Sequence, residues 1–170
     1  KVVPAYRQAQ QRGQVELTTS PYYHPIVPLL CDLRSAPAAL PHLPIPEAGF
    51  RHPDDAKWHL TQALERHART FGERPQGIWP PEGSVSEDVV RLAIEAGIRW
   101  MATDEEILWR TLKTSRSLSL LYRPHLLHRP QGRTAVIFRD RELSDLLGFV
   151  YSQWPAPAAV QDFLKRLEGI

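Results

Sequence analysis

The sequence contains almost no cysteine, and it lacks the short motifs that mark several large classes of enzyme. One cysteine among 170 residues excludes an internal disulfide bond and a zinc site made of several cysteines. The apolar stretch PLLCDL around Cys31 predicts a packed, unreactive thiol. No GxSxG nucleophile motif, GxxxxGK[ST] phosphate loop, HxxxH pair or HExxH pair occurs. We therefore expect no bound metal and no cofactor.

Long apolar runs and blocks of one charge are also missing. No stretch approaches the roughly 18 apolar residues of a transmembrane helix, and no basic run is interleaved with aromatic residues. With 42% hydrophobic residues, 24% charged residues and a net charge of +2, the composition is that of a soluble globular domain. We expect neither a membrane nor a nucleic acid as partner. The start, KVVPAYRQAQ, has no initiator methionine and is not a signal peptide, so we expect a piece cut at both ends from a longer protein that is cytoplasmic by default.

Strand-like and helix-like segments alternate along the chain, and sixteen prolines cluster between them, where turns are expected. The expected strands cover residues 14–20, 77–80, 98–104 and 134–140. Helices are expected over 54–72, from Ser84 or Ser86 to about Gly97, and over 157–168, with a turn and short helix in 142–154 and a long loop from 35 to 53.

This order of elements predicts an α/β fold with a parallel sheet. The expected strands end in polar residues, namely Ser20 and His24, Glu82, Asp104 and Asp140. In a barrel of parallel strands, all carboxyl ends open onto the face where active sites lie. Because a closed barrel usually needs about 250 residues, residues 1–170 are expected to supply one part of a TIM-type barrel.

Glu82 and Asp140 are the candidate catalytic residues. Each follows an expected strand, and Asp140 comes 58 positions after Glu82. Glycoside hydrolysis requires two carboxyl groups around the scissile sugar bond, one an ionised nucleophile and the other an acid for the leaving oxygen. A separation of about 5–5.5 Å would favour retention, and about 6.5–9.5 Å inversion. From spacing alone, two ordinary solvated turn acids remain the simpler interpretation.

Aromatic and polar residues near the same strand ends favour a sugar substrate, because the apolar faces of sugars stack on such rings. The candidates for substrate binding are Tyr23, His24, Trp79, Asp145, Tyr151 and Trp154, with Tyr22 close by. Trp79 can equally be a core residue. Arg139 and Arg141 flank Asp140, and a neighbouring guanidinium would favour the carboxylate form, which works against a general acid. The two arginines are therefore expected to bind other partners, or Asp140 must be buried.

Three stretches resemble successive conserved regions of glycoside hydrolase family 57. They are GQVELTTSPYYHPI (13–26), GIWPPEGSVS (77–86) and FRDRELSDLLGFVYS (138–152), and RHPDDA (51–56) also fits the stretch before the helix. The resemblance covers about residues 13–154, in the order of the family. It implies an incomplete TIM-type (β/α)7 barrel and a retaining double-displacement mechanism on α-glucans such as starch, glycogen or pullulan, without an obligatory metal. It also implies Glu82 as the nucleophile and Asp140 as the proton donor.

The motifs look closest to those of amylases and amylopullulanases, although the family also contains branching enzymes and glucanotransferases. Its opening HQP motif and its fifth conserved region are not found in this sequence. The barrel is therefore expected to be unclosed, which puts the activity of the isolated piece in doubt. Two alternatives stay open, a non-catalytic carbohydrate-binding protein on the same fold and a metal-dependent polysaccharide deacetylase.

Overall fold

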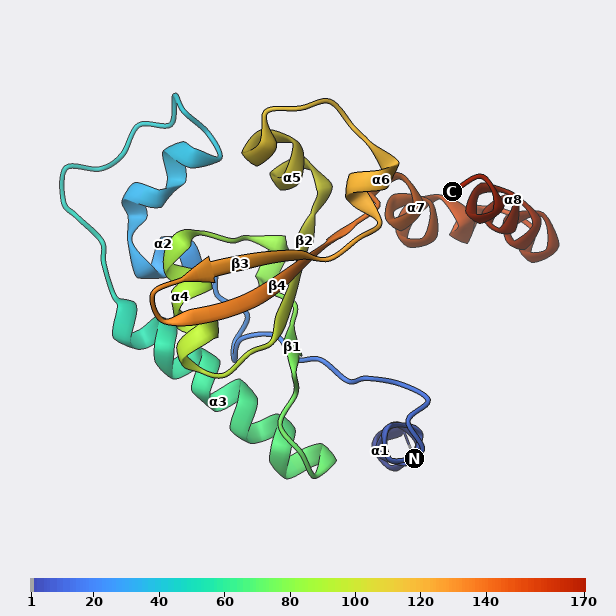
Figure 1. Ribbon diagram of the computed structural model, residues 1–170, viewed down its shortest axis with the longest axis horizontal. Helices are drawn as coiled ribbons and strands as arrows, with labels where there is room; N and C mark the ends of the chain where they lie inside the picture. The colour runs from blue at the N-terminus through green and yellow to red at the C-terminus, as the bar shows by residue number, and fades with distance from the viewer. Residues whose placement is uncertain (1) are drawn as a thin grey trace. The chain divides into compact units, whose positions relative to one another are not determined.

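The computed structural model describes residues 2–170, which form two compact units. The first unit contains the chain up to Thr103 together with His125–Val136, and the second contains Asp104–Pro124 and Ile137–Ile170. Figure 1 traces the elements along the chain. Each unit is described by itself below. Among the described residues, no helix is both long enough and apolar enough to cross a membrane.

The first unit contains helices and most of a small sheet. Its helices are α1 (Val2–Gln11), α2 (Val27–Cys31), α3 (Pro53–Phe71) and α4 (Glu87–Glu95), with 3-10 turns η1 (Leu33–Ala38) and η2 (Pro81–Gly83). The helices predicted over 54–72 and from Ser84 or Ser86 to about Gly97 are confirmed as α3 and α4. Asp54 and Asp55 lie in the first turn of α3, where negative charge favours the helix dipole, and Gly72 ends the helix at φ 98°. The Ser86 hydroxyl caps α4 by accepting from the Val89 N–H.

Four strands form one sheet in the order β1-β2-β4-β3. Their bounds are β1 Gly77–Ile78, β2 Trp100–Asp104, β3 His125–Arg129 and β4 Gly132–Arg139. β1 and β2 pair in parallel, with Ile78 opposite Met101, as the sequence predicted. The expectation of parallel strands is wrong for β3, which pairs antiparallel with β4. Because only Pro130 and Gln131 separate β3 from β4, the two strands can pair only as a hairpin.

The strand expected at residues 14–20 is reduced to one parallel bridge between Thr19 and Ile78. The Trp79 N–H donates to the Thr19 carbonyl at 2.9 Å, and the Thr19 N–H donates to the Gly77 carbonyl at 3.4 Å. Val15 is 39% exposed, so the alternation of Val15 and Leu17 with polar residues does not bury Val15 and does not produce a full strand. The long loop was expected to begin at residue 35, but the 3-10 turn η1 extends to Ala38. The rest of the expected loop is confirmed.

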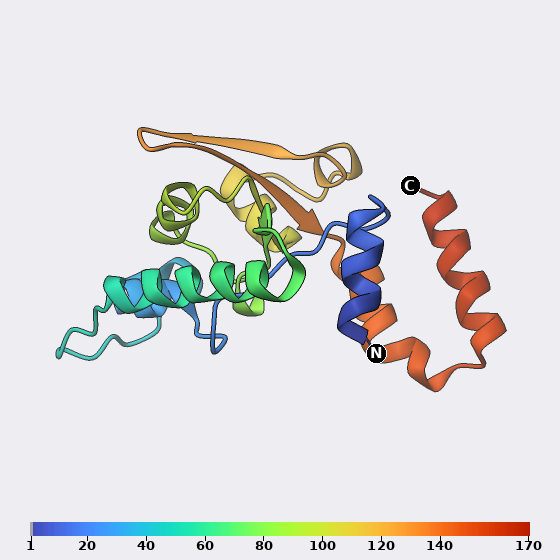
Figure 2. The same cartoon turned by 90° about the horizontal axis from the view of Figure 1, so that it is seen from below.

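The core of the first unit lies between the sheet and the helices α3 and α4. In Figure 2, α4 lies between the β3–β4 hairpin and α3. Ile78 and Met101 from the sheet and Ala93 from α4 are at most 1% exposed. Gly77 is required where it stands, because a Cβ atom there would lie 2.2 Å from the Trp100 ring. Cys31 is 2% exposed, which confirms the prediction of a packed cysteine, and burial raises the pKa of its thiol to about 11.

The second unit is mainly helical. It contains α5 (Glu105–Leu112), α6 (Leu118–Leu121), α7 (Arg141–Asp145), a π-helical turn η3 (Leu146–Val150), a 3-10 turn η4 (Tyr151–Gln153) and α8 (Ala156–Glu168). Leu108, Trp109 and Leu121 form its hydrophobic cluster, against which Phe138 packs. The predicted turn and short helix of 142–154 and the last helix are confirmed, whereas α5 and α6 were not predicted.

Candidate active site

Glu82 lies in the 3-10 turn η2, which follows β1 after Trp79 and Pro80, and its backbone geometry is unusual. Its φ and ψ are 55° and 21°, in the left-handed region that side chains other than glycine avoid. The turn is held by the Ser84 hydroxyl, which donates to the Pro81 carbonyl at 2.6 Å, and by the buried Thr103 hydroxyl, which donates to the Gly83 carbonyl. These bonds fix the backbone while the Glu82 side chain stays 75% exposed.

Within the first unit, the side chain of His24 contacts that of Glu82. Its Nε2 lies 3.5 Å from Glu82 Oε1, and its Nδ1 lies 3.2 Å from the Ser20 hydroxyl. His24 is also in the left-handed region, at φ 56°, as is Tyr23 at φ 60°. Backbone strain of this kind persists only where the surroundings impose it, and it gathers at functional sites. The structure thus brings together Glu82 and His24, which the sequence predicted to lie at one face.

The other aromatic candidates of the first unit differ in exposure. Trp79 is partly buried, so its exposure lies between that of a core residue and that of an open ring for a sugar. Its backbone N–H donates to the Thr19 carbonyl. Tyr23 is 79% exposed, and its ring centroid lies 4.5 Å from that of Tyr22. Tyr23 is therefore available to a ligand over most of its surface.

Asp140, in the second unit, is held far more tightly than Glu82. It caps α7, where its Oδ1 accepts from the Leu143 N–H at 2.9 Å. Its Oδ2 accepts from the Tyr122 hydroxyl at 2.5 Å and from Arg116 Nη2 at 2.7 Å, and the side chain is 8% exposed. Burial acts to raise the pKa of Asp140, but the Tyr122 and Leu143 hydrogen bonds and the Arg116 charge outweigh it, so the pKa is lowered overall. Burial, together with the bond to Asp140, raises the pKa of Tyr122 to about 12.

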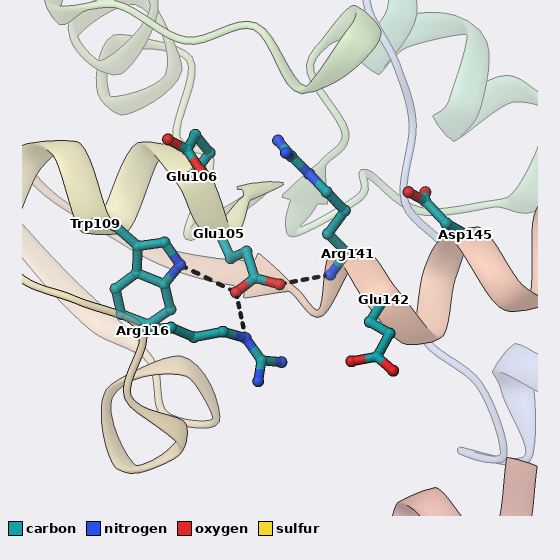
Figure 3. Close-up of a pocket in the computed structure, with 7 residues that line it drawn as sticks. All are labelled: Glu105, Glu106, Trp109, Arg116, Arg141, Glu142 and Asp145. Carbon is teal, nitrogen blue, oxygen red and sulfur yellow. Dashed lines mark hydrogen bonds and ion pairs between the residues drawn. The ribbon is translucent and has the colours of Figure 1, made fainter.

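Arg116 is itself fixed by Glu105, the first residue of α5. The Glu105 carboxylate is 6% exposed and accepts from Arg116 Nε at 2.8 Å, Trp109 Nε1 at 3.0 Å and the Arg141 N–H at 2.8 Å. Figure 3 shows these three bonds converging on Glu105. A pocket of about 410 Å³ opens beside them, lined by Glu105, Glu106, Trp109, Arg116, Arg141, Glu142 and Asp145. Sequence reasoning missed Arg116, Tyr122 and Glu105, because none belongs to a recognised motif.

The two arginines that flank Asp140 bind a different carboxylate. Arg139 Nε and Arg141 Nη2 donate to Asp104 at 2.9 Å and 2.6 Å. This confirms the prediction that they have other partners. Burial acts to raise the pKa of Asp104, but the bonds from both arginines and from the Glu106 N–H lower it overall. Asp145 lies 3.5 Å from Arg139 Nη1 and is 46% exposed.

Tyr151 and Trp154 form a ring pair in the second unit, with centroids 5.4 Å apart. Tyr151 is 9% exposed and its hydroxyl donates to Asp162 at 2.7 Å, whereas Trp154 is 42% exposed. Sugar binding by these two residues stays a prediction, and Trp154 offers the larger free surface. Within residues 2–170, no three His, Cys, Asp or Glu side chains are grouped as a metal ion would require.

A carboxylate on a strained turn after a parallel strand is typical of enzymes built on α/β folds, whose active sites lie at the carboxyl ends of strands. Comparison with known families then identifies the class. The model of glycosyl hydrolase family 57 matches residues 1–170, and the chain belongs to this family. No curated protein matches the chain significantly in sequence.

Several solved structures share the fold. A 4-alpha-glucanotransferase from Thermococcus litoralis is 22% identical, with a TM-score of 0.59, over 86% of this chain and 19% of its own. A GH57-type branching enzyme from Pyrococcus horikoshii is 22% identical, with a TM-score of 0.58, over 84% and 25%. The alpha-amylase AmyC from Thermotoga maritima is 17% identical, with a TM-score of 0.60, over 86% and 24%. The chain thus spans between about a fifth and a quarter of these proteins.

Proposed function

We propose that this chain is the part of a retaining, α-glucan-active glycoside hydrolase or transferase that carries both catalytic carboxylates. Membership of family 57 supports this proposal, as do the names of the three solved structures, a glucanotransferase, a branching enzyme and an amylase. The observation that carries it is Glu82, an exposed carboxylate on a strained turn in contact with His24. The residues then belong to an incomplete TIM-type (β/α)7 barrel, with an amylase-like or amylopullulanase-like preference.

In the proposed reaction, a Glu82 carboxylate oxygen attacks the anomeric carbon of the glucan. The bond between that carbon and the glycosidic oxygen breaks, and Asp140 gives its proton to the departing oxygen. Water then attacks the anomeric carbon of the glycosyl-enzyme, Asp140 takes the proton from that water, and the bond to Glu82 breaks. If a sugar hydroxyl replaces the water, the same steps give transfer. His24 contacts Glu82 and is proposed to orient it or to bind a substrate hydroxyl.

The role of Asp140 requires that it carry a proton before the first step. Its three donors favour the charged form. The Asp140 side chain is 8% exposed, and a bound glucan would cover this remaining surface. The loss of water then favours the protonated form, because desolvation disfavours the carboxylate. Substrate binding is therefore proposed to favour protonation of Asp140.

The test is turnover of soluble starch by the protein and by its Glu82→Gln and Glu82→Ala variants. We expect both substitutions to abolish hydrolysis, azide to restore turnover only in Glu82→Ala, and the first product of the unmodified protein to keep the α configuration by NMR. Glu47→Gln, at an exposed loop position, serves as the matched control and should retain activity. Full activity in Glu82→Gln refutes the proposal, and glucan binding without any turnover by the unmodified protein would indicate a carbohydrate-binding protein instead.

A further inference from the structure

A cluster of exposed aromatic rings lies beside the Glu82 turn in the first unit, and one of its members was not a candidate from the sequence. Trp58, on α3, is 47% exposed, and its ring centroid lies 6.4 Å from that of Tyr23, which is 79% exposed. The two ring planes are inclined by 35°. Tyr22 stands edge-on to Trp58 at 5.9 Å and 85°. Tyr23 and Trp58 are thus two neighbouring, largely exposed rings with Tyr22 against them, a cluster that we call the aromatic platform.

The platform is fixed by two hydrogen bonds, one between main chains and one from a side chain, that join two distant segments of the first unit. The Tyr22 N–H donates to the His59 carbonyl at 3.0 Å, and His59 Nδ1 in return contacts the Tyr22 carbonyl. These bonds tie the residue before Tyr23 to the residue after Trp58. The rings are therefore positioned before any ligand arrives, which lowers the entropy lost on binding.

The strained backbone links the platform to the catalytic candidate. Tyr23 and His24 are consecutive, and both adopt left-handed φ values of 60° and 56°. Two successive residues of this kind cost free energy and therefore need a compensating reason. The consequence of this conformation is that the Tyr23 ring stays in solvent beside Trp58 while the next side chain, His24, reaches Glu82 at 3.5 Å.

We propose that Tyr23 and Trp58 bind consecutive glucose units of an α-1,4-linked glucan chain and deliver it to Glu82. This inference rests on the proposed function and adds Trp58 and the mode of substrate binding to it. The apolar faces of glucose stack on aromatic rings, and the two ring planes are inclined to each other by 35°. An α-1,4-glucan curves along its length, whereas a β-1,4-glucan is a flat ribbon, so we expect the inclined rings to favour the first.

The test is binding of maltohexaose by isothermal titration calorimetry, in a Glu82→Gln background so that no turnover occurs. We expect Trp58→Ala and Tyr23→Ala each to weaken binding about tenfold, which corresponds to about 1.4 kcal/mol. Trp58→Phe keeps a ring and should restore most of the affinity. Tyr6→Ala is the matched control, because Tyr6 is a 51% exposed tyrosine of the same unit on α1 and should leave the affinity unchanged. Cellohexaose should bind far more weakly than maltohexaose.

In the active background, Trp58→Ala should raise KM for short malto-oligosaccharides and leave kcat nearly unchanged, because the platform holds the chain away from the reacting bond. Unchanged maltohexaose affinity in both alanine variants overturns the platform, as does an equal loss in Tyr6→Ala or no binding by the parent protein. The Glu82→Gln turnover measurement is independent of these results. If the protein turns over starch and Trp58→Ala leaves the maltohexaose affinity unchanged, the platform is refuted and the proposed function stands.

Discussion

Replacing Glu105 by alanine is expected to destabilise the second unit far more than the same change at its neighbour Glu106. Glu105 is 6% exposed and accepts three hydrogen bonds, from Trp109, Arg116 and the Arg141 N–H. Glu106 is 44% exposed on the same helix, and its side chain binds Arg110 one turn away. The two substitutions remove the same atoms from adjacent positions, so their difference isolates the buried network.

The magnitude follows from the three bonds. Each hydrogen bond to a charged group contributes about 1.5–3 kcal/mol, but Arg116 is 43% exposed, so its part is screened to about 1 kcal/mol or less. Water from the adjacent pocket can reach the abandoned Trp109 and Arg141 donors and recover part of their loss. We therefore expect Glu105→Ala to lower the free energy of unfolding by about 3 kcal/mol, against about 0.5 kcal/mol for Glu106→Ala.

Urea unfolding followed by circular dichroism measures both values. The loss at Glu105 should exceed that at Glu106 by at least about 2 kcal/mol. Equal effects of the two substitutions would show that the Glu105 carboxylate is solvated in solution, and the account of how Arg116 is positioned would then fail.

Two further predictions concern the candidate carboxylates. At position 82, glycine adopts the left-handed backbone without the steric penalty of a Cβ atom, so Glu82→Gly should be more stable than Glu82→Ala by about 1 kcal/mol in the same unfolding assay; an equal or more stable alanine variant would contradict the backbone strain. Arg116 lowers the pKa of Asp140, so Arg116→Met should raise that pKa, keep the proposed acid protonated to higher pH and move the basic limb of the pH–activity profile upward. A basic limb that stays in place or moves downward would argue against Asp140 as the acid.

Sequence patterns predicted the elements whose stability is local. Helix α3 has a proline and two aspartates at its start, an apolar stripe and a terminal glycine, and the structure confirms it almost to the residue. The short buried strands at Ile78 and Met101 were predicted from apolar runs between turn residues. Residues 14–20 show the limit of this approach, because alternation alone does not supply a neighbouring strand.

The hairpin was missed because the sequence HLLHR carries polar ends and a single apolar pair, a weak strand signal. Its formation depends on the partner strand Gly132–Arg139, which supplies the hydrogen bonds. Helix α5 was missed for a related reason. Its N-cap, Asp104, was interpreted only as the polar end of a strand, whereas its side chain also accepts from the Glu106 N–H at 2.9 Å and starts the helix.

In the candidate site too, some residues could be predicted from sequence motifs, whereas their partners could be found only from the fold. The motifs identified Glu82, His24 and Asp140, and the structure places His24 beside Glu82. They gave no account of the partners of Asp140, because Arg116 and Tyr122 come from the segment between β2 and β3, outside every recognised motif. Such contacts follow from tertiary packing, and no local pattern encodes them.

The different surroundings of the two carboxylates fit different chemical tasks. A nucleophile must reach a carbon atom, and Glu82 is 75% exposed on a turn whose backbone is fixed by Thr103 and Ser84. An acid–base residue must hold one position while it gives and takes a proton, and Asp140 is held by donors on both of its oxygens. Since Arg116 depends in turn on Glu105, a buried residue with no contact to the reacting groups in the proposed mechanism is expected to set the pH range in which Asp140 can act.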